Sequence, residues 1–288
     1  MGEIYEKMES VKSDEPDARG LFDALRISDA PPTTVISGSA KDKVYSLNYP
    51  KRGRCLIFNH KEFKKHTGLN TRNGTDADAA RLYCKFRELQ FDVSLFTDLK
   101  VEEVKKEIKK ASKEEHGENS AFVCCILSHG EQGVLYAADG KYTTDTVFTP
   151  FRGDNCPSLA GKPKIFFIQA CQGDQLDCGV TVECRETTDS NDSKELKIPV
   201  CADFLIVYST VPGFYSWRNT THGSWFIQAL CEAIQENIKD LDLLSILTIV
   251  NYKVAFSYES YTPHEPSMHL KKQIPSVNST LTRMIKFF

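Results

Sequence analysis

The feature that most constrains this chain of 288 residues is an apolar run that ends in a cysteine and a glycine. The run Lys164–Ile168 continues into Gln169-Ala170-Cys171-Gln172-Gly173. A short, continuous apolar run bounded by turn residues is typical of a buried strand in a parallel sheet. Sheets of this kind carry their chemistry at the carboxyl ends of the strands. Cys171 is therefore a candidate nucleophile rather than a core thiol.

A second apolar run ends in a histidine that could serve as the base. Ala121–Leu127 is followed by Ser128-His129-Gly130. If both runs are parallel strands of one sheet, His129 and Cys171 emerge at the same edge. An imidazole that takes the thiol proton and later protonates the leaving amine is the minimum equipment for acyl transfer. The backbone N–H groups of Gly130 and Cys171 are the candidate oxyanion donors.

Alternating strand and helix signals along the chain predict a three-layer α/β fold. Further strands are expected at Cys55–Asn59, Phe91–Phe96 and Phe204–Tyr208, and in the tail Gln273–Phe288. Helical spacing of apolar residues predicts helices over 75–89, 101–108, 223–239 and 241–256. We expect Thr75 to be the N-cap of the first helix, with Asp78 as its capping-box partner.

Two polar segments interrupt this pattern. Residues 1–44 carry few large apolar side chains, which predicts a disordered leader. Residues 172–198 form a long polar stretch directly after Cys171. A loop of this length inside a compact domain is usually functional or disordered.

Composition narrows the classes of function. The net charge of −3 argues against a nucleic-acid or anionic-membrane partner. No apolar stretch approaches the roughly 18 residues of a membrane span, and the N-terminus lacks a signal-peptide core. The 10 cysteines without a secretion signal indicate reduced thiols in a cytoplasmic protein. Their spacing matches no zinc site, and we expect neither a metal nor another cofactor.

Several motifs resemble the caspase family. Gln169-Ala170-Cys171-Gln172-Gly173 fits the signature of its nucleophile, and the family histidine lies about 50 residues upstream; here the separation is 171 − 129 = 42. The other matching motifs, between Tyr45 and the C-terminus, are Arg72-Asn73-Gly74-Thr75-Asp76, Ser128-His129-Gly130-Glu131, Ala202-Asp203-Phe204-Leu205, Tyr215-Ser216-Trp217-Arg218-Asn219, Gly223-Ser224-Trp225-Phe226 and Lys271-Lys272-Gln273-Ile274-Pro275. The chain resembles executioner (effector) caspases with a short prodomain, a group that includes vertebrate caspases three and seven and invertebrate effector caspases. The resemblance implies a central, mostly parallel six-stranded sheet flanked by helices.

The resemblance also implies a function: a cysteine endopeptidase of peptidase family C14 that cleaves after aspartate during apoptosis. It assigns the aspartate pocket to Arg72, Gln169 and Arg218, and guanidinium forks do bind carboxylates bidentately. An extended substrate would add as a strand to the segment that begins at Tyr215. The resemblance assigns the other substrate contacts to Tyr215, Ser216, Trp217, Asn219, Trp225 and Tyr261. It further implies that the backbone carbonyl of Asn70 orients His129.

The chain contains three sequences that match such a substrate. An acid, two intervening residues, an aspartate and then a small residue occur at Asp17, Asp189 and Asp192. We expect a zymogen that is cut in the loop 172–198. Cleavage would give a large catalytic subunit, 45–189, and a small one, 190–288. The partners implied by the family are protein substrates with aspartate before the scissile bond, a dimer of large/small subunit pairs, an upstream initiator caspase and inhibitor-of-apoptosis proteins.

Three alternative functions are compatible with parts of this pattern. A catalytically weak caspase homologue that acts as a regulatory binding protein would normally lack the nucleophile, the base or a pocket arginine. A glutamine amidotransferase also uses a cysteine on an α/β fold, but has no use for paired arginines. A related peptidase for basic residues would need acids at Arg72 and Arg218. Two departures from the family remain: Gln172 stands where most caspases have arginine, and the loop 262–267 leaves the distal pocket preference open.

Overall fold

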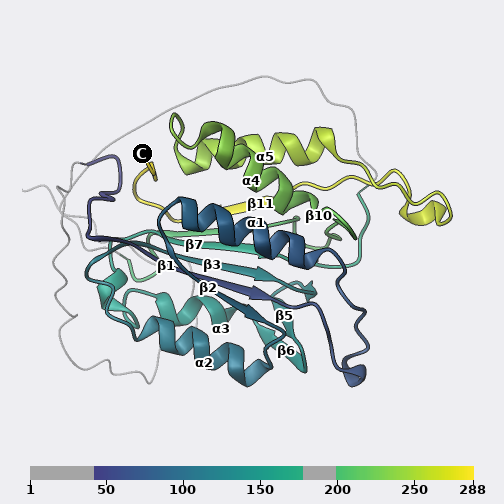
Figure 1. Ribbon diagram of the computed structural model, residues 1–288, viewed down its shortest axis with the longest axis horizontal. Helices are drawn as coiled ribbons and strands as arrows, with labels where there is room; N and C mark the ends of the chain where they lie inside the picture. Colours follow the sequence, from purple (N-terminus) through teal and green to yellow (C-terminus); the bar gives the residue numbers. More distant parts are fainter. Residues whose placement is uncertain (1–41, 178–198) are drawn as a thin grey trace, which may run out of the picture. The chain divides into compact units, whose positions relative to one another are not determined.

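The computed structural model describes residues 42–177 and 199–288, and its centre is a six-stranded sheet (Figure 1). The strand order is β11-β8-β7-β3-β1-β2. All neighbouring strands are parallel except β8 and β11, which are antiparallel. This confirms the predicted mostly parallel sheet. The strands are β1 (Lys51–Asn59), β2 (Asp92–Thr97), β3 (Asn119–Leu127), β7 (Lys164–Gln169), β8 (Phe204–Tyr208) and β11 (Ser276–Ser279).

Helices cover both faces of the sheet, as the alternation of strand and helix predicted (Figure 1). One face carries α1 (Thr75–Glu88), α4 (Trp225–Asn237) and α5 (Leu243–Ser257). The other face carries α2 (Val101–Ser112) and α3 (Asp145–Phe148). Because both faces are covered, β3 and β7 are buried along their whole length. Strands that are buried on both faces consist of continuous apolar runs, and these runs can be recognised in the sequence.

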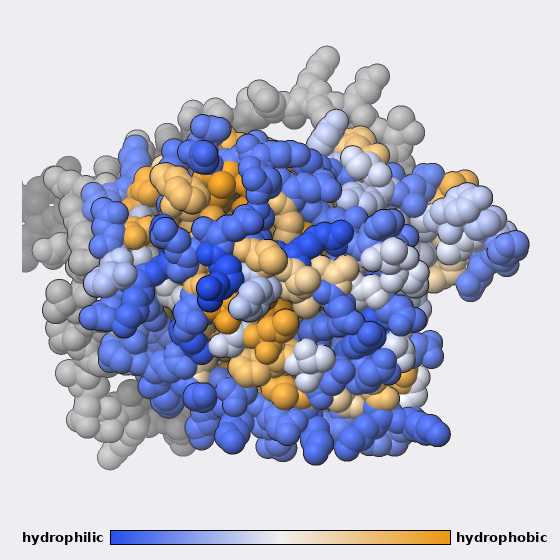
Figure 2. Space-filling model, in the orientation of Figure 1, coloured by the Kyte–Doolittle hydropathy of each residue, from blue (hydrophilic) through white to orange (hydrophobic). Residues whose placement is uncertain are grey.

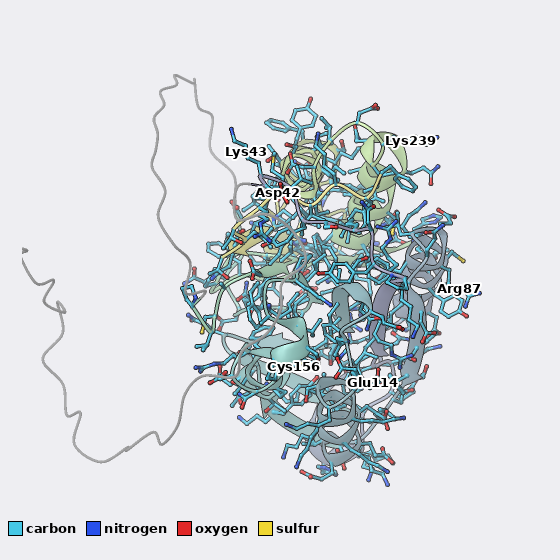
Figure 3. The ribbon with its side chains drawn as sticks, turned by 90° about the vertical axis from the view of Figure 1, so that its left-hand side faces the viewer. Asp42, Lys43, Arg87, Glu114, Cys156 and Lys239 are labelled. Atoms are coloured by element: carbon cyan, nitrogen blue, oxygen red, sulfur yellow. The ribbon has the colours of Figure 1, made fainter. Side chains whose placement is uncertain are left out.

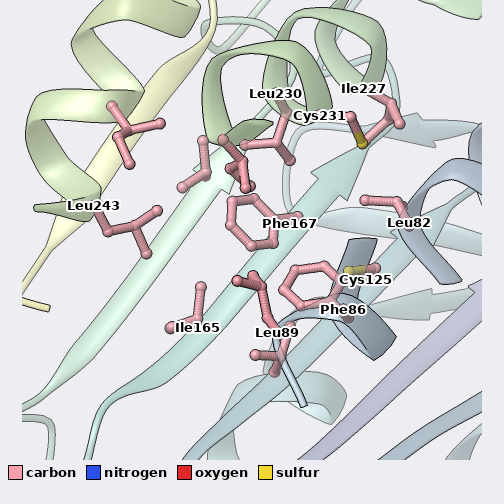
Figure 4. Packing of buried hydrophobic residues seen from close by; sticks show 14 of the residues in the cluster. Leu82, Phe86, Leu89, Cys125, Ile165, Phe167, Ile227, Leu230, Cys231 and Leu243 are labelled. Carbon is pink, nitrogen blue, oxygen red and sulfur yellow. The ribbon is translucent and has the colours of Figure 1, made fainter. Parts of the chain in front are cut away.

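Alternate residues of each strand enter two separate cores. Cys125 and Phe167 belong to the core under α1, α4 and α5, where Phe86 of α1 and Leu230 of α4 lie over them (Figure 4). Phe166 belongs to the second core, on the side of α2 and α3. These cores fix the strands, and therefore the loops at their carboxyl ends.

Smaller elements surround the sheet and were not predicted. A three-stranded sheet directly follows β3, made of β4 (Gly130–Glu131), β5 (Val134–Ala137) and β6 (Gly140–Thr143). A second, two-stranded sheet joins β9 (Arg218–Asn219) to β10 (Gly223–Ser224). Short 3-10 helices lie at Lys65–Thr67, Thr149–Phe151, Pro157–Leu159 and Pro266–Met268.

The predicted cap of the first helix is wrong. Gly74 is the N-cap, and Thr75 is the first helical residue. The Thr75 hydroxyl instead donates to Asn59 Oδ1 at 2.7 Å. Asp78 is fully buried and accepts the backbone N–H of Ser224 from the other end of the chain. Asp78 therefore bonds to Ser224 instead of forming a capping box with Thr75.

The predicted final strand is shorter than expected. Within the tail Gln273–Phe288, the strand that joins the sheet is Ser276–Ser279. Beyond it the chain packs against the other terminus of the described structure: Tyr45 N–H donates to Met284 O, and Met284 N–H donates to Lys43 O at 2.8 Å. Figure 3 labels Lys43 at this start of the described chain.

The face shown in Figure 2 is largely hydrophilic, with apolar residues gathered near the middle of the view and toward its upper left. Single exposed apolar side chains are normal for a folded domain. Among the helices of residues 42–177 and 199–288, none has the length and apolar character needed to cross a bilayer.

Candidate active site

The register of two neighbouring strands places the cysteine beside the histidine. β3 and β7 are parallel, and Leu127 pairs with Gln169. His129 and Cys171 each lie two residues beyond that pair. The N–H of Ser128 donates to Gln169 O at 3.0 Å, which extends the pairing toward the loop. Both side chains line one cavity of about 240 Å³.

The turn after the cysteine is held by close backbone contacts. Gln172 N–H donates to Phe214 O at 3.0 Å, and Gly213 N–H donates to Gln172 O at 2.8 Å. Gly173 has φ 155°, and a Cβ there would lie 2.3 Å from Gly213 O. Glycine is therefore required where the cysteine turn meets the 213–216 segment.

One ring nitrogen of His129 is held by the backbone. Its Nε2 lies 2.8 Å from Asn70 O, the carbonyl that the family resemblance implied. Because a carbonyl only accepts, Nε2 carries the proton and Nδ1 is the basic atom. The Phe63 ring lies 5.0 Å from the imidazole between centroids. The ring is thus held in one tautomer and packed in place.

Burial and charge set the protonation of the pair. Burial, together with the charges of Arg72 and Arg218, lowers the pKa of His129 to about 4, while the Asn70 carbonyl opposes this shift. Burial raises the pKa of Cys171, against the effects of the Ser216 backbone and the two arginines. The Ser216 N–H lies 3.4 Å from Sγ. At neutral pH the pair therefore rests as a thiol and a neutral imidazole.

Gly130 packs against the backbone of Cys171. A Cβ on Gly130 would lie 2.8 Å from Cys171 O and 2.9 Å from Ala170 Cβ. Any larger residue would push the two turns apart. The backbone at this position is close enough to Cys171 to act on a group bound there.

The same cavity holds two arginines. Arg72 is 1% exposed, and its Nη1 donates to His60 O at 2.9 Å and to Thr75 Oγ1 at 2.8 Å. Its Nε and Nη2 are buried and have no hydrogen-bond partner among the described residues. Arg218 donates from Nε to Asn73 O at 2.8 Å. Burial, and then the charge of Arg218, lowers the pKa of Arg72 to about 9.

Buried donors without partners are costly, and a carboxylate in the cavity would satisfy them. The amide of Gln169 is already engaged, since Nε2 donates to Ser216 Oγ at 2.7 Å, while Oε1 is buried without a partner in the described part of the chain. The cavity therefore suits a short acidic side chain bound mainly by the arginines.

The cavity gathers most of the predicted site. Its lining includes Arg72, His129, Gln169, Cys171, Tyr215, Ser216, Trp217 and Arg218. Asn219 and Tyr261 do not line it. Asn219 Oδ1 accepts two backbone N–H groups of its own turn, and Tyr261 is 82% exposed with its ring against His269. Trp225 lies behind Trp217, with stacked rings 5.7 Å apart.

Three residues near the site were missed by sequence reasoning. Met268 lines the cavity, and Tyr258 stacks on Trp225 at 5.5 Å. Gln273 is 2% exposed; it accepts Trp217 N–H at 2.6 Å and donates to Ser209 O at 2.7 Å. Gln273 belongs to the motif Lys271-Lys272-Gln273-Ile274-Pro275, and this motif could have pointed to a role near the site. Met268 ends a 3-10 helix of only three residues, which is too short to leave a periodic signal in the sequence.

Comparisons with known proteins agree with this geometry. The family model for the caspase domain matches residues 52–286. The chain is 48% identical to caspase drICE of Drosophila melanogaster over 244 residues, which is 84% of this chain and 72% of that protein. It is 47% identical to caspase-7 of Gallus gallus over 84% of this chain and 79% of the relative. The crystal structure of caspase-1 from Spodoptera frugiperda superposes with a TM-score of 0.83 at 43% identity, covering 89% of this chain and 97% of that one. The chain therefore belongs to the caspase family and is an effector caspase, an aspartate-specific cysteine endopeptidase that acts in apoptosis.

Proposed function

We propose that Cys171 is the nucleophile and His129 the base of this peptidase, and that Arg72, Gln169 and Arg218 bind the substrate aspartate. The observation that carries the proposal is the shared cavity of about 240 Å³, where the thiol and imidazole meet two arginines. The guanidinium of Arg72 has buried N–H donors without partners, and a carboxylate could accept hydrogen bonds from them. No other side chain of the lining supplies a comparable cation.

The reaction follows from this arrangement. The thiol proton moves to His129 Nδ1 as Sγ forms a bond to the substrate carbonyl carbon. The backbone N–H groups of Gly130 and Cys171 stabilise the oxyanion. The C–N bond then breaks, and the imidazolium gives its proton to the leaving amine. Water, deprotonated by His129, hydrolyses the thioester and restores the thiol.

The remaining substrate contacts form an extended binding edge. Tyr215, Ser216 and Trp217 line the cavity next to the aspartate pocket, and Met268 joins them. A substrate strand adds along this segment, with main-chain hydrogen bonds for affinity and alternate side chains for specificity. Asn219, Trp225 and Tyr261 serve positions further along the peptide.

Activation proceeds by cleavage at aspartate. The cutting sites are Asp189 and Asp192 between the subunits and Asp17 in the leader, all outside the described residues. The cut after Asp189 separates the large subunit 45–189, with Cys171 and His129, from the small subunit 190–288, with Arg218. The first 44 residues are a short prodomain.

The partners are proteins cut after aspartate, an upstream initiator caspase and inhibitor-of-apoptosis proteins, and the protein works in the cytoplasm. Two large/small pairs associate as a dimer. The strand β11 stands at the edge of the sheet, with β8 on its inner side, which leaves its outer side for a second copy.

Covalent labelling tests the assignment of the nucleophile. A peptidyl fluoromethyl ketone ending in aspartate should add to processed protein, and digestion followed by mass spectrometry should locate the adduct on Cys171. His129→Ala should slow the labelling, and the matched asparagine reagent should label far more slowly. Modification of the exposed Cys84 in place of Cys171 would refute the assignment.

A further inference from the structure

A buried carboxylate outside the cavity links the two segments that carry the pocket arginines. Asp78 lies in the first turn of α1 and is 0% exposed. Both of its oxygens accept the backbone N–H of Ser224, at 2.9 and 3.0 Å. Asp78 does not line the cavity itself. A single side chain on α1 thus holds the backbone of β10, whose partner strand β9 begins at Arg218.

Two glycines permit the close approach of these segments. Gly223 has φ 89°, and a Cβ there would lie 2.1 Å from Asp78 Oδ1. Gly74 has φ 88°, and a Cβ there would lie 2.3 Å from Asn219 O. Gly74 thus lies where the chain near Asn219 approaches, and Gly223 lies where Asp78 approaches. Both glycines adopt a backbone conformation that other residues rarely take.

Further contacts complete this junction between residues 73–81 and 218–224. Arg218 Nε donates to Asn73 O at 2.8 Å. Arg81 Nη1 contacts His222 O and lies 4.0 Å from Asp78 Oδ1. Asp78 is the buried charge at the centre of the 73–81/218–224 junction. The position of Arg218 relative to Arg72 depends on this junction, because Arg72 directly precedes it.

The charge of Asp78 acts on both arginines. Burial lowers the pKa of Arg218, and Asp78 opposes that effect. Burial also lowers the pKa of Arg72, and the charge of Asp78 opposes that effect as well. Burial raises the pKa of Asp78 itself to about 6. The hydrogen bonds from Ser224 and the charge of Arg72 oppose this rise. Two desolvated cations that face one cavity repel each other, and a buried anion beside them reduces that cost.

We propose that Asp78 is a positioning residue for the aspartate pocket: it fixes the β9–β10 segment against α1 and supplies the counter-charge that holds Arg72 and Arg218 together before substrate binds. The inference rests on the proposed aspartate pocket. It also has a consequence for binding. The carboxylate that offsets the two arginines in the free enzyme competes electrostatically with the substrate carboxylate for them.

The two roles of Asp78 predict opposite effects for two substitutions. Asp78→Asn keeps an oxygen that accepts the Ser224 N–H but removes the charge, so the substrate carboxylate meets less competition. Asp78→Ala removes the acceptor as well and loosens the segment that carries Arg218. The KM for an aspartate peptide should fall about threefold in Asp78→Asn and rise about tenfold in Asp78→Ala, with kcat within about twofold in Asp78→Asn.

A ligand-binding measurement separates the charge from a merely structural role. Without the counter-charge, the free Asp78→Asn protein should melt several degrees below wild type, and a peptide aldehyde ending in aspartate should raise its melting temperature by more than it raises that of wild type. Asp76→Asn is the matched control, since Asp76 is in the same turn but is exposed and paired with Lys61 Nζ at 2.7 Å. The control should show the wild-type KM and the wild-type response to the aldehyde.

The outcomes are distinct. A lower KM and a larger aldehyde response in Asp78→Asn support the proposal, even if Asp78→Ala fails to fold. A KM that is unchanged or raised in Asp78→Asn overturns it, because the charge then has no role in the pocket. Wild-type turnover is measured beside the variants: an inactive wild type would overturn the proposed function together with this inference, whereas an active wild type and an unresponsive Asp78→Asn would count against Asp78 alone.

Discussion

At the scale of single residues, the protonation of Cys171 and His129, the proposed nucleophile and base, determines how the proposed reaction starts. The pKa of the thiol is raised by burial and that of the imidazole is lowered to about 4. The free enzyme therefore does not hold a thiolate–imidazolium pair. Proton transfer accompanies the attack on the substrate carbonyl, so the thiol is least reactive when no substrate is present.

The pH dependence of kcat/KM tests this directly, because kcat/KM reports ionisations of the free enzyme. An ordinary imidazole gains its proton near pH 6.5. In the folded protein the pKa of His129 is about 4, so the base stays neutral as the pH falls from 7 to about 5. We expect kcat/KM to fall by no more than about twofold over that range, and the protonation of Asp78, whose pKa is about 6, should raise it by up to about threefold. Initial rates at constant ionic strength, with circular dichroism to check the fold, provide the measurement; half-loss of activity near pH 6.5 would contradict it.

At the scale of elements, loops that are far apart in the sequence form the binding edge, and Gln273 joins them. Its side chain links the Trp217 backbone N–H to the Ser209 carbonyl, while Ser209 Oγ donates to Ala170 O at 3.0 Å. The wall of the pocket is therefore connected to Ala170, the residue that precedes Cys171. Moving one of these loops would move the others.

Replacing Gln273 with alanine should weaken this connection. The substitution leaves the Trp217 N–H and Ser209 O without partners, and each buried unsatisfied group costs about 1–3 kcal/mol. We expect the melting temperature to fall by about 5 °C and KM to rise several-fold, with a smaller change in kcat. Calorimetry and steady-state kinetics measure both. Lys239→Ala, an exposed residue after α4, is the control and should behave as wild type; an equal loss in both variants would argue against a specific role for Gln273.

The strands, and the placement of Cys171 beside His129, could be predicted because they depend on local pattern. Apolar runs marked β3 and β7, and glycine turns marked the residues that follow them. Asp78 could not be assigned, because its partner Ser224 lies 146 residues away and the local capping pattern pointed to Thr75. Met268 was missed for a similar reason, since the short 3-10 helix that brings it to the cavity carries no periodic signal.

At the scale of the whole molecule, the site is divided between two halves of the chain. Cys171 and His129 come before the polar loop, and Arg218 comes after it. The cysteine turn and the arginine segment are joined by backbone contacts such as Gln172 to Phe214. The proposed cut between the halves would therefore change the connection of the loops that form the pocket, without removing Cys171, His129 or Arg218.

Blocking that cut should keep the enzyme latent. Asp189→Ala should remain a single chain on a denaturing gel when an upstream caspase is added, and its turnover should stay well below that of processed wild type. Asp192→Ala, tested alone, shows whether the neighbouring aspartate is an equivalent site. Full activity in uncut Asp189→Ala protein would show that cleavage there is not what completes the pocket.

The most direct test of the central claim is turnover of matched reporter peptides by processed protein. The peptides differ only in the residue before the scissile bond, which is aspartate, asparagine or arginine. If Arg72 and Arg218 bind the substrate carboxylate as proposed, kcat/KM for aspartate should exceed that for asparagine by about a hundredfold or more. Arginine should not be cut, and Cys171→Ala should be inactive. Comparable turnover of asparagine, or any turnover of arginine, would contradict the account.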